Sequence, residues 1–131
     1  MNKFEQLGLS ESLQRAIIDL GFENPTEVQE KAIPLLLEKD TDLVALAQTG
    51  TGKTAAFGFP VIQKIDADNR NTQALILSPT RELCLQITNE LKNYSKYEKG
   101  INVVAVYGGA SITEQARDIK RGAQIIVATP G

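Results

Sequence analysis

The sequence predicts an α/β fold with a mostly parallel sheet and helices on both faces. Short apolar runs alternate with segments of helical periodicity, which is the order of strand–helix–strand units. The runs ALIL, VVAV and IIVA are apolar throughout, as is typical of strands that are covered on both faces. A glycine-rich stretch, AQTGTGKT, stands between an apolar run and a helical pattern. These three observations predict the fold class.

The sequence of the first half of the chain predicts three helices and a strand. Ser10 has the residue type and position of a helix cap, and Thr26 begins a second helix that Pro34 should kink or restart. Residues 42–47, DLVALA, predict a short buried strand that runs into the glycine-rich stretch. A third helix is expected from residue 53 to about residue 65, although it contains a glycine and a proline.

The second half continues the alternation. Residues 74–77 predict a strand, and Thr80 begins a helix with apolar side chains on one face. Residues 101–106 predict the next strand, and Ser111 begins a helix in a sequence of capping-box form. Residues 124–128 predict the last strand.

Composition limits the possible classes of protein. The 131 residues are 42% hydrophobic and 23% charged, which is the balance of one globular domain. The net charge of −2 means that any nucleic-acid binding must come from local motifs. One cysteine, Cys84, excludes an internal disulfide, and the expected setting is reducing and cytoplasmic. No apolar run reaches the roughly 18 residues of a membrane span, and the N-terminus does not resemble a secretion signal.

The glycine-rich stretch predicts a phosphate-binding loop. Its pattern is Ala47-x4-Gly52-Lys53-Thr54, with Ala where the usual template begins with Gly. Backbone N–H groups of the loop and of the following helix N-terminus can face phosphate, and Lys53 can reach its outer oxygens. The Thr54 hydroxyl can ligate Mg²⁺. A turn that binds nothing is the alternative, which the preceding apolar run and the GKT ending disfavour. The candidate ATP-binding residues of the loop are Ala47, Gln48, Thr49, Gly50, Thr51, Gly52, Lys53 and Thr54.

Hydrolysis would need an acidic partner for the Mg²⁺, and such a residue normally ends a buried strand. Asp66 and Asp68 follow VIQKI, which two polar residues interrupt and which has the pattern of a helix end. The last predicted strand is followed by Thr129, which is not a carboxylate. We therefore expect the catalytic acid to be absent from this chain.

Several stretches together resemble the DEAD-box family of ATP-dependent RNA helicases. They are GFENPTEVQ with Phe4 upstream, AQTGTGKT, PTRELCLQ, YGG and TPG, in family order along nearly the whole chain. The resemblance implies a RecA-like P-loop NTPase fold and identifies residues 1–131 as the N-terminal part of the helicase ATP-binding domain. Residues 1–30 would be the adenine-recognition region, or Q motif, and residues 31–131 an incomplete P-loop core. The chain would stop before the Asp-Glu-Ala-Asp strand, and the second helicase domain would follow in cis in the full-length protein.

The resemblance also extends the ATP-binding set to Phe4, Phe22, Thr26 and Gln29. Gln29 would recognise adenine through its amide, whereas the sequence Thr26-Glu27-Val28-Gln29 by itself predicts a capping box. The two roles can coexist, because a cap fixes the helix that presents the amide. Phe22 would lie against the adenine, or else be a core aromatic. Phe4 would support the adenine pocket, or else anchor the N-terminal arm. Lys53 and Thr54 are the residues implied to act in catalysis.

The resemblance implies that three further motifs, which begin at Pro79, Tyr107 and Thr129, hold RNA through its backbone. Thr80 and Arg81, after Pro79, combine a hydroxyl, a helix N-terminus and a cation, although an ordinary cap with an exposed Arg has the same sequence. A glycine pair would let backbone approach a phosphate, although a tight turn needs the same residues. Backbone contacts imply no RNA sequence preference. The candidate RNA-binding residues are Pro79, Thr80, Arg81, Gly108, Gly109, Thr129 and Gly131.

The expected function is that of the ATP-binding part of an RNA helicase, with ATP, Mg²⁺ and RNA as ligands and no membrane association. The full-length protein would be an RNA-stimulated ATPase that unwinds duplexes locally. A DNA helicase of the same superfamily is one alternative, because nothing in the residues separates RNA from DNA. A nucleotide-binding module without turnover is the other alternative.

Overall fold

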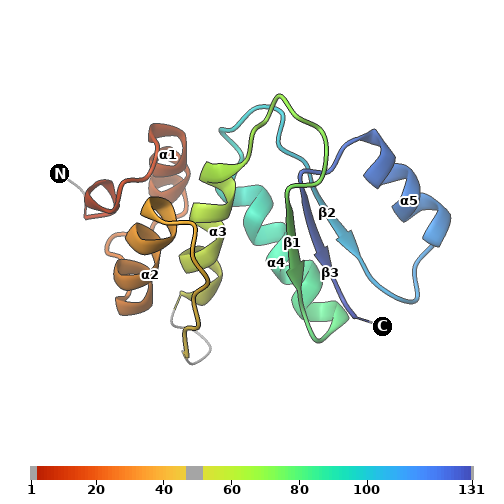
Figure 1. Cartoon of the computed structure of the whole chain (residues 1–131), viewed down its shortest axis with the longest axis horizontal. Coiled ribbons are helices and arrows are strands. Elements are labelled where there is room, and N and C mark those ends of the chain that lie inside the picture. Colours follow the sequence, from red (N-terminus) through yellow and green to blue (C-terminus); the bar gives the residue numbers. More distant parts are fainter. Residues whose placement is uncertain (1–2, 47–51, 131) are drawn as a thin grey trace. The chain divides into compact units, whose positions relative to one another are not determined.

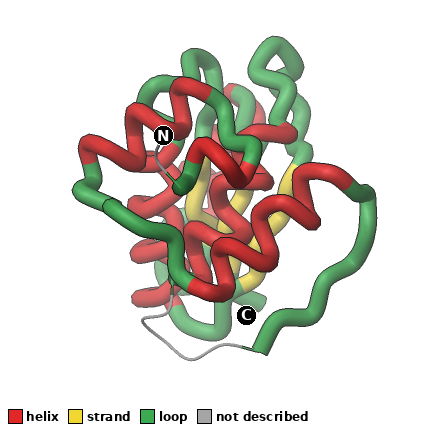
Figure 2. Tube along the Cα trace, turned by 90° about the vertical axis from the view of Figure 1, so that its left-hand side faces the viewer, coloured by secondary structure: helices red, strands yellow, loops and turns green. Residues whose placement is uncertain are grey.

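The computed structural model describes residues 3–46 and 52–130. The chain forms two compact units, Met1–Lys64 and Ile65–Gly131. In the described residues the first unit is helical and the second contains a three-stranded sheet, as Figures 1 and 2 show. Each unit buries apolar side chains of its own.

The helical unit contains a 3-10 helix and three α-helices: η1 (Glu5–Leu7), α1 (Glu11–Asp19), α2 (Glu27–Glu38) and α3 (Lys53–Lys64). The predicted caps are confirmed, since the Ser10 hydroxyl accepts from the Leu13 N–H and the Thr26 hydroxyl from the Gln29 N–H. Helix α2 continues through Pro34 as one helix, so of the two predicted alternatives the restart is wrong and the kink stays a prediction. The capping bonds supply partners for N–H groups that a helix start leaves free.

Phe4 anchors the N-terminal segment in the core of the helical unit. Its side chain is 1% exposed and meets Phe59 of α3 edge to face, with ring centroids 6.5 Å apart. Gln63, near the end of α3, ties the same segment by hydrogen bonds. Its amide oxygen accepts from the Ser10 N–H at 2.8 Å, and its amide nitrogen donates to the Gly8 carbonyl at 2.9 Å. These surroundings are those expected of a hydrophobic anchor, which was one of the two interpretations of Phe4.

The sheet unit contains three parallel strands and two helices: β1 (Ala74–Leu77), α4 (Arg81–Tyr94), β2 (Val103–Val106), α5 (Ile112–Arg121) and β3 (Ile125–Ala128). The strand order is β1-β3-β2, so β3 is central. Right-handed crossovers in this order put α4 and α5 on opposite faces of the sheet, as Figure 1 shows. The predicted parallel sheet with helices on both faces is confirmed.

Parallel pairing brings the carboxyl ends of the three strands to one edge of the sheet. The Ser78 N–H donates to the Ala128 carbonyl at 2.9 Å, and the Thr129 N–H donates to the Val106 carbonyl at 3.0 Å. The segments that follow the strands therefore start side by side. Those segments contain the predicted motifs PTR, YGG and TPG.

The predicted buried strand at residues 42–47 is not formed in its described part. Residues 42–46 have no strand structure, and the side chains of Val44 and Leu46 are 88% and 97% exposed. An apolar segment forms a strand only where a neighbouring strand completes the hydrogen-bond ladder. Among the described residues, the sheet is β1-β3-β2 and gives residues 42–46 no such neighbour.

Gln124 is the most deeply buried polar side chain in the sheet unit, with an exposed fraction of 0%. Its amide oxygen accepts from the Asn102 N–H at 2.9 Å, and its nitrogen donates to the Gly100 carbonyl at 2.6 Å and the Ala67 carbonyl at 3.4 Å. Gln124 directly precedes β3, and its amide thus links that strand to the start of β2 and to the turn at residues 66–69.

Replacing Gln124 with Leu should lower the free energy of unfolding by about 1–3 kcal/mol, because the buried N–H and carbonyl groups lose their partners. Urea unfolding would measure the loss. Gln86→Leu is the matched control, since Gln86 is exposed and its amide donates to the carboxylate of Glu90 on the same helix. Equal unfolding midpoints for the two variants would contradict the role assigned to Gln124.

Strand β1 pairs only with β3 among the described residues, and we expect its other edge to cause self-association. The strand sequence ALIL has neither charge nor proline to protect that edge, and Leu75 and Leu77 are 62% and 63% exposed. We expect the sedimentation coefficient of the chain to rise with concentration, and to rise less when both leucines are replaced by Lys. Ile112→Lys, at an isolated residue that is 84% exposed, should leave the rise unchanged. A compact monomer at all concentrations would overturn this expectation.

Candidate functional site

The described part of the predicted phosphate loop is its junction with α3. Gly52 has a φ of +82°, and Lys53 is the first residue of the helix. The side chain of Lys53 is exposed and that of Thr54 is half-buried. A helix that begins with a Lys and a Thr in its first turn can bring its free N–H groups, an ammonium and a hydroxyl to one anion. The other loop candidates, Ala47, Gln48, Thr49, Gly50 and Thr51, lie outside the described residues.

Gln29 connects the beginning of α2 to the beginning of α3. Its amide oxygen accepts from the Thr26 N–H at 3.0 Å, which completes the predicted capping box. Its amide nitrogen donates to the Gly52 carbonyl at 3.2 Å. The Gln29 side chain is only 4% exposed. Two segments that are 23 residues apart in the sequence, and that we predicted separately as ATP contacts, therefore meet through this amide.

Gly52 fits this contact because it has no side chain. A Cβ there would lie 2.9 Å from the Thr26 hydroxyl and would collide with the Gln29 amide. The positive φ also disfavours any other residue. The structure thus requires glycine at this position for two independent reasons.

The two aromatic candidates differ in their surroundings. Phe4 lies in the core, as described above, whereas Phe22 is half-buried in the turn after α1. The Phe22 N–H donates to the Ile17 carbonyl at 3.1 Å, which holds the turn against the helix. Of the two, Phe22 is the one with part of its ring surface accessible.

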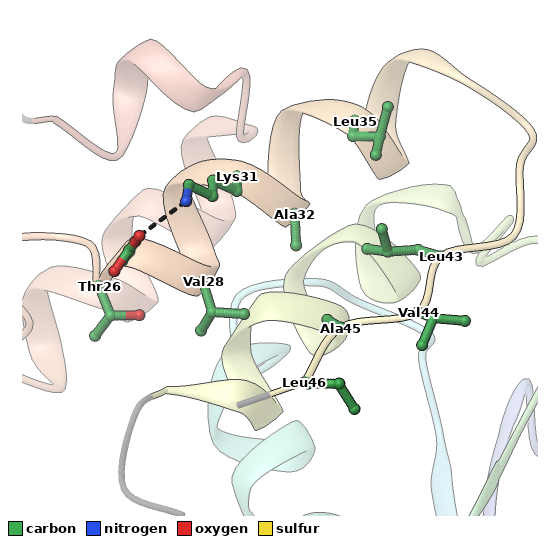
Figure 3. Close-up of a pocket in the computed structure, with 10 residues that line it drawn as sticks. Thr26, Val28, Lys31, Ala32, Leu35, Leu43, Val44, Ala45 and Leu46 are labelled. Atoms are coloured by element: carbon green, nitrogen blue, oxygen red, sulfur yellow. Dashed lines mark hydrogen bonds and ion pairs between the residues drawn. The ribbon is translucent and has the colours of Figure 1, made fainter. Parts of the chain in front are cut away.

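A cavity of about 640 Å³ lies beside α2. Figure 3 shows Val28, Ala32 and Leu35 of the helix on one side of it and residues 43–46 on the other. An ion pair between Lys31 and Glu27 stands among the lining residues, with 2.8 Å between the charged atoms. This contact lowers the pKa of Glu27 and raises the pKa of Lys31, but both groups are exposed and contribute little to stability. Among the predicted ATP contacts that lie in residues 3–46 and 52–130, only Thr26 lines this apolar cavity.

The sheet unit brings most of the predicted RNA-binding residues together at the carboxyl ends of its strands. The Thr80 hydroxyl caps α4 by accepting from the Leu83 N–H at 3.2 Å. The Arg81 guanidinium lies over the Tyr107 ring, 4.9 Å from its centroid. Thr129 follows β3 and is half-buried, and Pro79 follows β1 and is exposed. Gly131 lies outside the described residues.

The two glycines after β2 differ in backbone conformation. Gly109 has a φ of +86°, so the turn itself favours glycine there. Gly108 has no such φ, and a Cβ added to it would meet no atom within 4 Å. The tight-turn interpretation therefore explains Gly109 but leaves Gly108 without a structural reason.

Tyr107 and Gln115, which lie near the carboxyl ends of the strands, were not among the predicted RNA contacts. The Tyr107 N–H donates to the Gln115 amide oxygen at 3.2 Å, and the Gln115 amide nitrogen donates to the Tyr107 carbonyl at 3.0 Å. The position of Tyr107 directly before the glycine pair was the available signal for Tyr107. No sequence pattern pointed to Gln115.

Other chemistry is limited in the described part of the chain. No group of three or more His, Cys, Asp or Glu side chains there could hold a metal ion. Cys84 is buried, as predicted, and burial raises the pKa of its thiol. None of the described helices is long and apolar enough to cross a bilayer.

Comparison with known proteins adds to this geometry. The family model described as DEAD/DEAH box helicase matches residues 26–131. The ATP-dependent RNA helicase CshA of Listeria monocytogenes is 53% identical over 131 residues, which are 100% of this chain and 25% of that protein. The chain spans about a quarter of the length of this and two other curated relatives that it matches.

Solved structures agree in fold. A DEAD box protein from Methanococcus jannaschii has a TM-score of 0.92 and 42% identity, over 98% of this chain and 34% of that chain. A variant of S. cerevisiae Dbp5 bound to RNA and ADP BeF3 has a TM-score of 0.86 and 32% identity, over 100% of this chain and 32% of that one.

The contact between Gln29 and Gly52 can be tested by comparing two glycines. Gly52→Ala should cost about 1–2 kcal/mol of unfolding free energy through its positive φ, and more through the collision with the Gln29 amide. Gly21→Ala is the control, because Gly21 has a φ of +78° but no atom within 4 Å of an added Cβ. Urea unfolding of both variants measures the difference. Equal losses would mean that the Gln29 contact does not restrict Gly52.

Proposed function

Because this chain belongs to the DEAD/DEAH box helicase family and has the RecA-like α/β fold of its relatives, we propose that it is the ATP-binding part of an ATP-dependent RNA helicase. The full-length protein would couple ATP binding and hydrolysis to RNA binding and local duplex unwinding. The observation that carries the proposal is the hydrogen bond from the Gln29 amide to the Gly52 carbonyl. It joins the segment expected to recognise adenine to the loop expected to hold phosphate.

The phosphates of ATP would bind at the N-terminus of α3. The first helical N–H groups and the exposed ammonium of Lys53 offer positive charge to the outer phosphates. The Thr54 hydroxyl would ligate Mg²⁺, which also takes phosphate and water oxygens and would neutralise charge on the transferred phosphoryl group. The donor set fits such an ion, because Mg²⁺ needs few protein ligands when a nucleotide supplies the others.

Adenine would be recognised by the donor and the acceptor of the Gln29 amide that the capping box and the Gly52 carbonyl do not use. A glutamine amide has two N–H donors and two lone pairs, and the capping box and the Gly52 carbonyl occupy one of each. One donor and one acceptor therefore remain for the adenine edge, and guanine would present the opposite pattern to them. Phe22 would cover a face of the base, with Thr26 fixing the helix start.

RNA would bind at the carboxyl ends of the strands in the sheet unit. The N-terminus of α4 with Thr80, the Arg81 guanidinium and the open backbone at Gly108 are suited to phosphate oxygens. Pro79, Gly109 and Thr129 would shape this surface, and Gly131 would extend it. Contacts of this kind hold the backbone and do not select a sequence.

Two further elements belong to the proposal for the full-length protein. The Asp-Glu-Ala-Asp strand of the first domain would supply the acid for hydrolysis, and a second helicase domain in cis would close over ATP and RNA. A reducing, cytoplasmic setting is proposed as well, because the single cysteine forms no internal disulfide. Residues 1–131 alone are then expected to bind nucleotide without steady turnover.

In the full-length protein, Lys53→Ala should lower the RNA-stimulated ATPase rate by at least about 100-fold, because it removes the cation that stabilises phosphate charge. Steady-state phosphate release with and without single-stranded RNA measures this. Lys64→Ala is the control, since Lys64 is a solvent-accessible Lys at the opposite end of the same helix and is paired with Asp40.

An ATPase rate that RNA leaves unchanged would refute the proposed function. Equal stimulation by RNA and by DNA oligonucleotides would instead favour a nucleic-acid-dependent ATPase without a preference for RNA. Measurable turnover by residues 1–131 alone would refute the expectation that these residues only bind nucleotide.

A further inference from the structure

The environment of Arg81 is unusual for an exposed cation. Its guanidinium lies over the Tyr107 ring at 4.9 Å and forms no ion pair within residues 3–46 and 52–130. Its Nη1 atom is 3.7 Å from the position that a Cβ of Gly109 would take. The side chain is thus directed from the start of α4 toward the end of β2 and the glycine turn.

Stacking uses one part of the guanidinium and leaves another part available. The flat face interacts with the aromatic ring, while the N–H donors point outward in the plane of the group. Those donors are the ones that bind a phosphate in bidentate fashion. Contact with the ring is therefore compatible with phosphate binding by Arg81, and it favours the side-chain conformations that keep the guanidinium over Tyr107.

Tyr107 is itself held by a second residue. The Gln115 amide accepts from the Tyr107 N–H at 3.2 Å and donates to the Tyr107 carbonyl at 3.0 Å, so it occupies both backbone groups of one residue. Gln115 is fixed in turn by α5, whose start is capped by the Ser111 hydroxyl accepting from the Glu114 N–H at 3.2 Å. A continuous series of contacts thus runs from α5 through Gln115 and Tyr107 to Arg81.

We propose that Tyr107, held by Gln115, is a positioning residue that presents Arg81 to the RNA backbone. This inference rests on the proposed RNA surface and adds two residues to it. Ordering the Arg81 side chain before RNA arrives lowers the entropy cost of forming the phosphate contact. The ring acts through the guanidinium and need not touch RNA itself.

The test uses the full-length protein, single variants of Tyr107 and Arg81, and the double variant that combines Tyr107→Leu with Arg81→Ala. The readouts are the concentration of single-stranded oligoadenylate that gives half-maximal ATPase stimulation, the KM for ATP, and the urea unfolding midpoint. Tyr107→Leu should raise the half-maximal RNA concentration roughly three- to tenfold by removing the stack, with the KM for ATP unchanged. Tyr107→Phe keeps the aromatic face and should behave like the unmodified protein. Arg81→Ala should raise the RNA concentration, and Tyr107→Leu should add little in its background.

A matched control is available at Tyr97, where the Lys96 ammonium lies 5.2 Å from the ring centroid. Tyr97→Leu removes a cation–π contact of the same kind outside the proposed surface, so the half-maximal RNA concentration should not change. Additive effects of Tyr107→Leu and Arg81→Ala, or equal effects of Tyr107→Leu and Tyr107→Phe, would overturn the proposal.

A loss of stability in Tyr107→Leu and a failure of the proposed function itself are distinguished from a failure of this inference. If Tyr107→Leu lowers the unfolding midpoint, Arg81→Lys decides, because it keeps the charge but loses the flat stacking group. RNA affinity equal to that of the unmodified protein in Arg81→Lys then overturns the positioning role. Absence of RNA stimulation in the unmodified protein would instead refute the proposed function on which this inference rests.

Discussion

A glutamine amide that bridges two pieces of backbone is the interaction on which both units of this chain depend. The amide has a donor and an acceptor at its tip, so it can substitute for a peptide group of a neighbouring strand or helix. It is also neutral, and its burial costs far less than that of a charged group. A glutamate could accept from the same N–H groups but could not donate to the facing carbonyls. In the part of the chain that the structure describes, five glutamines bridge backbone in this way: Gln29, Gln63, Gln73, Gln115 and Gln124.

Gln29 is the bridge with the largest consequence for the proposed function. Its bonds to Thr26 and Gly52 fix the relative position of two helix N-termini, and helix N-termini are the places where a chain can face an anion without further side chains. A nucleotide that engaged the remaining donor and acceptor of the amide would meet a group already oriented by its other bonds. The capping role and the adenine role are therefore complementary, because the cap supplies the rigidity that recognition needs.

The elements that could be predicted from sequence are those whose energy is local. The caps at Ser10, Thr26, Thr80 and Ser111 depend on residues three positions away, and all four are formed. The segment 42–46 has strand-like composition, yet a strand exists only when another strand pairs with it, and composition does not contain that partner. The bridges from Gln29 to Gly52 and from Gln115 to Tyr107 join residues 23 and 8 positions apart, so no periodicity indicates them. Sequence therefore predicts the individual helices and strands better than the contacts that assemble a site.

The two candidate surfaces belong to different compact units, the nucleotide residues to Met1–Lys64 and the RNA residues to Ile65–Gly131. ATP binding can change RNA affinity only if the two ligands favour the same arrangement of those units, since coupling is a free energy shared between states of the whole protein. Neither the Gln29 contact to Gly52 nor the Arg81 contact to Tyr107 spans both units. Each contact instead prepares its own ligand site in advance. Affinity for each ligand can thus be built into each unit separately, whereas any coupling of ATP to RNA would be a property of the states of the whole protein.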